Sequence, residues 1–250
     1  MHTVDHTLDL LRTHGPTTPG AALHATRFFV AGSGVITLAF EGMTEGLLGL
    51  KKRIADGLRA EHPGSTWPKV TLAALEGAAP LSRDEIAALW AATSYADSIL
   101  AASPPVVEIR DLTAVEALTR SLELTGRKVQ LTLGDRLERT IPSDHRRYVD
   151  GILEQWRASP SEGYVAMLRK VGHGREHYHR PCRMRTLVSY QEVGFSAVDA
   201  LRDRLDRVMP GRYHWFDPSA RHITIRTLEP VESGSELEAV EFLSEHHLDP

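Results

Sequence analysis

Two short motifs, far apart in the sequence, each place a basic side chain two residues before a threonine. One is His222-Ile223-Thr224 and the other is Lys69-Val70-Thr71. Residues two positions apart on a strand point to the same side, so each motif presents a basic group and a hydroxyl together. An imidazole exchanges protons near neutral pH, and a threonine hydroxyl donates a hydrogen bond to a phosphate oxygen. Two such strands facing each other would suit metal-free chemistry on a phosphodiester.

The two motifs differ in their basic residue, because Lys69 stands where the second copy has His222. An unperturbed lysine has a pKa of roughly 10.4, so Lys69 holds negative charge better than it accepts a proton. The competing interpretation is structural. In that case Thr71 and Thr224 are ordinary strand residues and Lys69 is a solvated strand end.

Similar elements surround the two motifs. The first copy follows strands at 28–30 and 35–40, a turn at 32–34 and a helix at 44–61, and it lies in a strand at 69–75. The second follows a strand at 184–190 and a helix at 196–209, and it lies in a strand at 222–228. Val35 precedes Lys69 by 34 positions and Thr186 precedes His222 by 36, which indicates an internal duplication.

The other expected elements are helices at 3–12, 82–101, 113–124, 142–156 and 234–243, and strands at 106–109, 128–133 and 164–169. Ser82 and Glu85 form a capping-box pattern at the start of one helix. The chain thus divides into an N-terminal extension (1–25), a first repeat (26–102), a middle region (103–183) and a second repeat with a C-terminal helix (184–250). The middle region either extends the same sheet or forms a small lobe beside it.

The paired motifs resemble those of the two-histidine phosphoesterases, a superfamily that includes RNA 2',3'-cyclic phosphodiesterases and 2'-5' RNA ligase-like proteins. The resemblance covers roughly residues 28–101 and 184–230, with the first histidine replaced by Lys69. It implies an α/β (α+β) fold, duplicated and bilobal, with two mostly antiparallel sheets around a central cleft and helices outside. It also implies that His222, Thr224, Lys69 and Thr71 form the catalytic site, and that no cofactor or metal is used.

Several further side chains are candidates for substrate binding. Arg226 continues the alternation of the second motif, and Trp67 precedes the first; each has a structural alternative, an exposed sheet arginine and a core tryptophan. The basic, histidine-rich segment 172–183 contributes His177, Tyr178 and His179. Arginine forks suit phosphate oxygens and a tyrosine can stack on a base, whereas the alternative is a solvated loop.

The same segment has a second interpretation, since His173, His177, His179 and Cys182 are residue types that bind zinc. Their spacing matches no familiar zinc pattern, and a site formed wholly by one short loop is unusual. A polar loop beside the phosphate site is therefore the favoured interpretation, with no metal.

The composition of the chain argues against some classes of protein. The 250 residues carry a net charge of -4, which argues against a general polyanion-binding protein. One cysteine excludes an intrachain disulfide, and the absence of a long apolar run near the start favours a cytoplasmic protein without membrane association.

The favoured function is a metal-independent phosphodiesterase-like hydrolase with His222 as general acid or base. Its expected partner is a small nucleotide-like or cyclic phosphate, or a short RNA end. Two alternatives remain open: a noncatalytic nucleotide- or RNA-binding relative that lost its first histidine, and a biosynthetic enzyme with a repurposed cleft.

Overall fold

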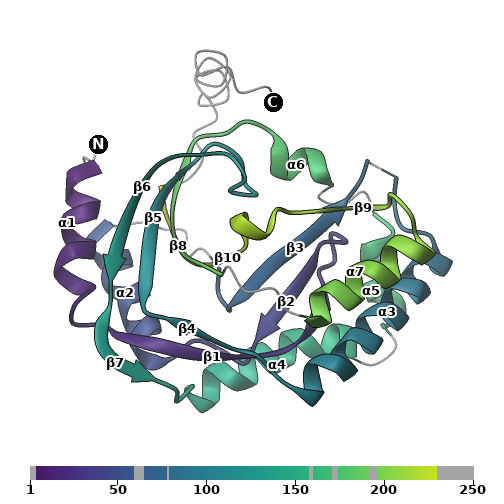
Figure 1. Cartoon of the computed structure of the whole chain (residues 1–250), viewed down its shortest axis with the longest axis horizontal. Coiled ribbons are helices and arrows are strands. Elements are labelled where there is room, and N and C mark those ends of the chain that lie inside the picture. The colour runs from purple at the N-terminus through teal and green to yellow at the C-terminus, as the bar shows by residue number, and fades with distance from the viewer. Residues whose placement is uncertain are drawn as a thin grey trace.

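The computed structural model of the chain describes residues 4–58, 65–77, 79–157, 160–170, 174–191 and 196–229. These residues form seven α-helices and a strongly curled sheet of ten strands, so the expected α+β class is confirmed (Figure 1). The strands are β1 (Pro19–Val30), β2 (Ile36–Phe40), β3 (Lys69–Leu75), β4 (Val106–Ile109), β5 (Asp111–Ala117), β6 (Thr125–Thr132), β7 (Gly134–Glu138), β8 (Met184–Tyr190), β9 (Tyr213–Trp215) and β10 (His222–Glu229). The helices are α1 (Val4–His14), α2 (Glu45–Leu58), α3 (Arg83–Ala102), α4 (Ser143–Arg157), α5 (Glu162–Leu168), α6 (Arg175–His179) and α7 (Ser196–Val208).

The sheet follows one continuous strand order, β4-β1-β2-β3-β10-β8-β5-β6, with β7 beside β1 and β9 beside β3. The pairings between these strands are antiparallel except the parallel contact of β7 with β1. Segments distant in sequence therefore lie side by side at the centre, where β3 meets β10. This junction joins the two basic motifs.

The elements around the first motif form where the sequence pattern placed them. β1 and β2 are joined by a tight turn in which Ala31 N donates to Val35 O at 2.9 Å. Gly34 has φ +84, and a Cβ there would lie 2.6 Å from Leu75 Cδ1, so both backbone and packing require glycine. Helix α3 begins with the predicted capping box of Ser82 and Glu85. β1 is much longer than expected, since it begins at Pro19.

The second motif also lies on a strand preceded by a strand and a helix, β8, α7 and β10. The helix predicted at 234–243 falls outside the described residues. The middle region extends the sheet rather than standing apart, since β4 pairs with β1 and β5 pairs with β8.

Two expectations for the middle region are wrong. The helix expected at 113–124 is instead β5 followed by a turn, because β5 lies between β8 and β6 and is apolar on both faces. When both faces of a strand carry apolar residues, some of these residues also fall at the spacing of a helix, and the sequence pattern therefore also fits a helix. The strand expected at 164–169 is instead α5, which begins where the Ser161 side chain accepts from Tyr164 N.

One hydrophobic core spans most of the described elements. Helix α2 contacts β1 and β10, while α3 contacts β1 and α7. Figure 1 shows α3, α5 and α7 gathered on one side of the curled sheet and α1 and α2 on the other. None of the described helices combines the length and the apolar character needed to cross a membrane.

Candidate functional site

The two basic motifs meet at the junction of β3 and β10. Val70 pairs with Ile223 in an antiparallel register. This register sets Lys69 opposite Thr224 and Thr71 opposite His222, so the four side chains occupy a square on one face of the sheet. All four are partly exposed, whereas Val70 and Ile223 between them are fully buried. Diagonal neighbours across such a pair are about 7–8 Å apart, which is the separation expected between the Lys69 and His222 positions.

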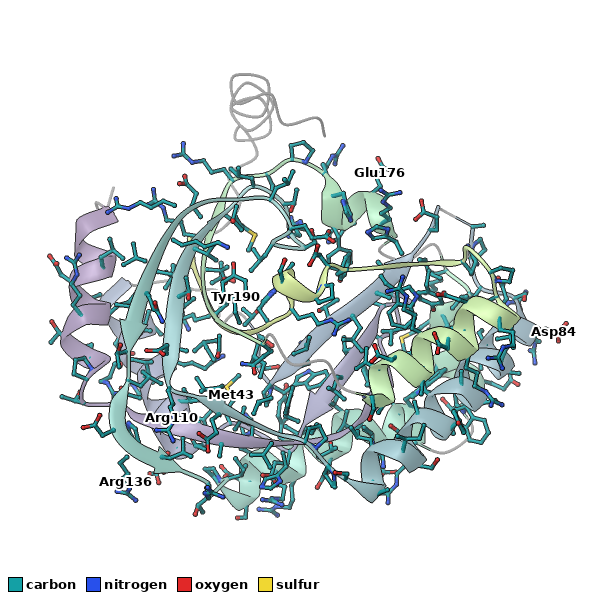
Figure 2. The ribbon with its side chains drawn as sticks, in the orientation of Figure 1. Met43, Asp84, Arg110, Arg136, Glu176 and Tyr190 are labelled. Atoms are coloured by element: carbon teal, nitrogen blue, oxygen red, sulfur yellow. The ribbon has the colours of Figure 1, made fainter. Side chains whose placement is uncertain are left out.

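The row of side chains through His222 continues onto neighbouring strands. Thr37 pairs with Thr71, and Tyr190 pairs with His222, so all four face the same way. The Tyr190 ring lies 6.3 Å from the His222 ring, inside the curl of the sheet (Figure 2). Lys128 of β6 reaches the same tyrosine, with its Nζ 4.7 Å from the ring centroid. The curl thus adds an aromatic ring and a cation to the face that carries His222.

The His222 ring is fixed in orientation and tautomer by its own chain. Its Nδ1 lies 2.7 Å from Ala220 O, and a carbonyl only accepts, so Nδ1 carries the proton. In the neutral ring Nε2 is then the basic nitrogen. Burial lowers the pKa of His222 from its ordinary value of 6.5, with the Ala220 hydrogen bond acting in the other direction. The ring is therefore a neutral base at physiological pH.

Ala220 belongs to a short excursion between β9 and β10, the 3-10 helix η1 (Pro218–Ala220). Both strands lie along β3: Ala73 pairs with Trp215 of β9, and Val70 pairs with Ile223 of β10. β9 and β10 thus act as one interrupted strand with η1 inserted before His222. The excursion is held at Asp217, whose N donates to Glu123 Oε1 at 2.9 Å and whose side chain accepts from Ser219 N.

Lys69 is the first residue of β3 and forms one corner of the square. Its Nζ is 3.2 Å from Ser65 Oγ and 4.3 Å from the centroid of the Trp67 ring. Burial lowers its pKa from 10.5 to about 8. The ammonium form still predominates at neutral pH, but it gives up its proton more readily than an exposed lysine.

Lys51 of α2 is a second cation at this junction and was not expected from the sequence. Its Nζ donates to Ile225 O at 2.7 Å and also to Ser65 O, so it bridges β10 and the segment that precedes β3. Its pKa falls to about 8, first through burial and then through the charges of Arg226 and Lys69. Among the described residues no carboxylate forms an ion pair with Lys51 or Lys69. The junction thus carries excess positive charge, which favours an anion.

Arg226 does not continue the alternation of His222 and Thr224. The register between β10 and β8 slips between Thr224, paired with Val188, and Arg226, paired with Leu187. The bulge turns Arg226 to the other face. There it is only 3 % exposed, and burial lowers its pKa while Asp56 of α2 acts in the opposite direction. Its charge acts on Lys51 rather than on the exposed square.

The remaining predicted binding residues lie in two other places. Trp67 is buried and packs edge-to-face on Phe29, with ring centroids 5.6 Å apart, so its main contacts are with the core and Lys69. Tyr178 packs on Phe216 at 5.1 Å and against His177 at 5.2 Å, and burial raises its pKa to about 12. Within the segment 172–183, which was expected to be a loop, residues Arg175–His179 form the helix α6.

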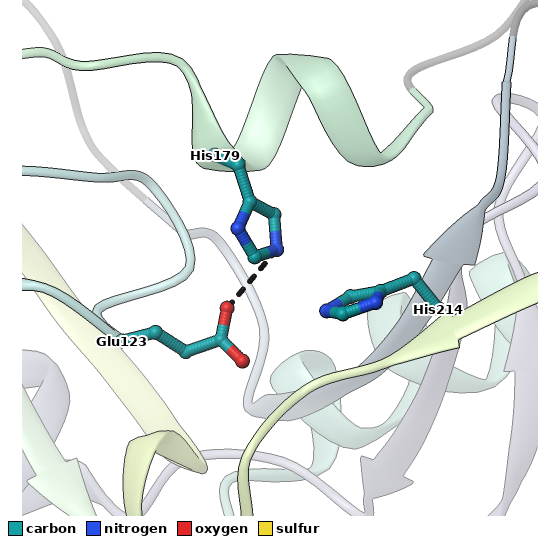
Figure 3. A group of neighbouring side chains, drawn as sticks. All are labelled: Glu123, His179 and His214. Carbon is teal, nitrogen blue, oxygen red and sulfur yellow. Dashed lines mark ion pairs between the residues drawn. The ribbon is translucent and has the colours of Figure 1, made fainter. Parts of the chain in front are cut away.

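His179 joins a separate cluster with two residues that the sequence did not suggest (Figure 3). His179 Nε2 lies 3.1 Å from Glu123 Oε2, and the His179 and His214 ring centroids are 4.7 Å apart. Burial lowers the pKa of His179, and the Glu123 carboxylate acts against this. Two arginines of the segment 172–183 form ion pairs with acidic residues: Arg175 with Glu76 and Arg183 with Glu116.

A cavity of about 590 Å³ is formed by other residues, two of which, His145 and Tyr148, hydrogen-bond Thr66. Three carboxylates contribute to its wall, which disfavours a phosphate, and none of the predicted site residues lines it. Its lining residues are Glu45, Leu48, Glu138, Thr140, Pro142, Asp144, His145 and Tyr148.

Sequence reasoning missed Lys51, Glu123 and His214. Lys51 sits on a helix beside the equally polar Lys52, and no sequence pattern distinguishes the two. Glu123 lies in a segment expected to be helical, where it would be solvated. His214 lies eight residues before His222 on a short strand, and only the pairing of β9 with β3 shows its neighbours.

No family model, no curated protein and no solved structure matches this chain.

Proposed function

We propose that this chain is a metal-independent phosphodiesterase-like hydrolase acting on a small nucleotide-like or cyclic phosphate. The observation that carries the proposal is the pairing of Val70 with Ile223, which gathers both basic motifs on one face. The excess positive charge of Lys51 and Lys69 at the same junction supports an anionic substrate. The resemblance to two-histidine phosphoesterases rests on the same residues and is part of the proposal.

The chemistry assigned to the square is hydrolysis by a water molecule. His222 Nε2 accepts a proton as the water oxygen bonds to phosphorus, and the bond from phosphorus to the leaving oxygen breaks. Lys69, with its pKa of about 8, donates the proton that the leaving oxygen takes up. The hydroxyls of Thr71 and Thr224 donate hydrogen bonds to the nonbridging oxygens as their charge grows. The site thus regenerates when His222 releases its proton and Lys69 regains one.

The strand order supports the duplicated, bilobal interpretation. Reading outward from the junction, β3 is followed by β2 and β1 on one side, and β10 is followed by β8 and β5 on the other. A helix connects the inner two strands on each side, α2 between β2 and β3 and α7 between β8 and β10. This order is what a duplication about the β3–β10 junction would produce, with the two basic motifs at equivalent places.

Turnover of 2',3'-cyclic nucleotides, linear 2'-5' dinucleotides and ADP-ribose 1'',2''-cyclic phosphate tests the proposal. We expect hydrolysis of at least one substrate by the wild type and a loss of about 10²–10⁴-fold in His222→Ala, since general acid–base catalysis contributes that much. His24→Ala, a change at a partly exposed histidine on β1, serves as the control and should retain activity. Equal rates for wild type and His222→Ala would remove His222 from the mechanism.

The cationic junction also favours a second candidate, a noncatalytic nucleotide- or RNA-binding protein. Here Lys51 and Lys69 hold a phosphate that is never cleaved. Titration with nucleotides and short RNAs should then show binding without turnover. Lys69→Ala should abolish the binding and Lys52→Ala, at a lysine 76 % exposed, should preserve it. Any turnover that depends on His222 excludes this candidate.

A further inference from the structure

Three potential metal ligands converge beside α6. One ligand atom each from Glu123, His179 and His214 can be chosen so that all three lie within 4.8 Å of one another (Figure 3). The closest pair is His179 Nε2 and Glu123 Oε2, 3.1 Å apart. All three atoms are buried; the first two face each other as an ion pair, whereas His214 Nε2 has no hydrogen-bond partner among the described residues. Buried polar atoms are nearly always satisfied, so an unpartnered imidazole nitrogen beside this ion pair calls for an explanation.

Backbone hydrogen bonds fix the three segments that supply these side chains. His214 lies on β9 and pairs with Ala74 of β3. The turn after β5, which contains Glu123, is tied to the α6 region twice: Ser121 N donates to Tyr178 O at 3.1 Å and Cys182 N donates to Leu118 O at 2.9 Å. The convergence therefore follows from the fold and not from the placement of one loop.

We propose that Glu123, His179 and His214 bind a divalent transition-metal ion of the zinc type. Two imidazoles and one carboxylate match the ligand preference of zinc, whereas magnesium and calcium prefer oxygen ligands alone. Ligand atoms around tetrahedral zinc lie about 3.4 Å apart, a value that follows from metal–ligand bonds of roughly 2.1 Å. The 3.1 Å pair is close to this spacing, and the His214 ligand atom lies within 4.8 Å of both, so binding an ion would draw the three atoms closer together.

The surroundings of Glu123 resemble the outer shell of a metal site. Its Oε1 accepts a hydrogen bond from Asp217 N, which leaves Oε2 directed at His179. Three protein ligands leave a fourth position for water. A bound ion would link α6, the turn after β5 and β9, and through Glu123 it would hold the excursion that precedes His222. This inference goes beyond the proposed phosphodiester chemistry, which uses no metal.

Direct metal binding by the full chain, prepared without a histidine tag and freed of metal with a chelator, tests the site. We expect the protein to bind one equivalent of Zn²⁺ in a calorimetric titration. Bound Co²⁺ should develop the visible absorption of a four- or five-coordinate ion, and excess Mg²⁺ should not displace it. His179→Ala and Glu123→Gln should each weaken Zn²⁺ binding by at least about 10-fold.

His177→Ala is the matched control, because His177 lies on the same short helix and packs against Tyr178 instead. It should bind Zn²⁺ as the wild type does. Glu123→Gln keeps an oxygen acceptor for Asp217 N, so it separates ligation from the structural role of Glu123; circular dichroism confirms folding. The site is refuted if the wild type binds no equivalent of Zn²⁺, or if Glu123→Gln and His179→Ala bind it as tightly as His177→Ala. Neither result depends on phosphodiesterase activity.

Discussion

His222 and Lys69 carry ordinary side chains whose proton affinities are set by their surroundings. Burial lowers the pKa of both, and the effect has opposite chemical consequences. For His222 it secures the neutral base, with Nδ1 committed to Ala220 O and Nε2 left basic. For Lys69 burial lowers the pKa to about 8, so the ammonium group can exchange a proton near neutral pH. A lysine at the position of the first motif that corresponds to His222 can therefore still exchange a proton near pH 8.

Asp97 of α3 allows a test, at a single residue, of how burial shifts a pKa and thereby changes stability. Its Oδ1 accepts from Phe28 N at 2.7 Å, and burial raises its pKa from 3.8 to about 6, against the Phe28 hydrogen bond and the charge of Arg27. The folded protein thus binds this proton more tightly than the unfolded chain, so stability falls as pH rises from about 4 to 6. Asp97→Asn keeps the acceptor without the charge. We expect it to stabilise the protein by about 1–2 kcal/mol at pH 8 and to lose that advantage below pH 4.

Urea unfolding at several pH values measures this difference. Asp84→Asn, at an exposed acid in the first turn of the same helix, is the comparison. Because Asp97 is unchanged in this variant, its free energy of unfolding should follow that of the wild type at every pH, with a difference of less than about 1 kcal/mol. An Asp97→Asn protein that is less stable than the wild type at pH 8 would contradict the assigned burial cost.

The candidate site was predictable only where chemistry and strand periodicity coincide. His222, Thr224, Lys69 and Thr71 share one face because alternation along a strand is a local property, and the sequence shows it. Their meeting across β3 and β10 depends on the pairing of segments more than a hundred residues apart. The cluster at Glu123 depends in the same way on the pairing of β9 with β3. No local pattern encodes such convergence.

Among the helices and strands, the sequence predicted the ones that have a distinct start signal or a single buried face. Ser82 and Glu85 marked α3, and the glycines at 32–34 marked the hairpin of β1 and β2. The prediction failed for β5, which is covered on both faces, and for α5, which is too short to show a helical period. Leu122 has a left-handed backbone with φ 62 in the turn after β5, and leucine gives no signal for this conformation.

The β3–β10 junction is an element whose stability depends on a helix. The strands pair at Val70 and Ile223, and Lys51 donates hydrogen bonds to Ser65 O and Ile225 O beside this pair. Lys51→Met preserves the length of the side chain but removes these donors. We expect it to lower the free energy of unfolding, by less than the roughly 1–3 kcal/mol that buried carbonyls lose with their partner, because removal of the buried charge acts in the opposite direction.

Lys52→Met provides the matched control for denaturant unfolding, since Lys52 is the next residue on α2 and only forms an exposed ion pair with Asp56. Its effect should remain within about 0.5 kcal/mol. Equal stabilities for the two variants would mean that Lys51 does not hold the junction.

At the scale of the whole molecule, one sheet and one core connect the segments around the two basic motifs. The same hydrophobic cluster contains Leu23 of β1, Leu187 of β8 and Leu205 of α7. We therefore expect a single cooperative unfolding transition, with far-ultraviolet circular dichroism and tryptophan fluorescence giving the same midpoint. Two separated transitions would show that parts of the chain unfold as independent units, contrary to the continuous sheet.

The interruption between β9 and β10 has a consequence for how this molecule can change over evolutionary time. Both ends of the excursion are anchored on β3, at Ala73 through Trp215 and at Val70 through Ile223. Insertions or deletions between these anchors would alter the wall beside His222 without displacing either strand. The segment from Asp217 to Arg221 is therefore where the surroundings of His222 can vary among descendants while both pairings with β3 are kept.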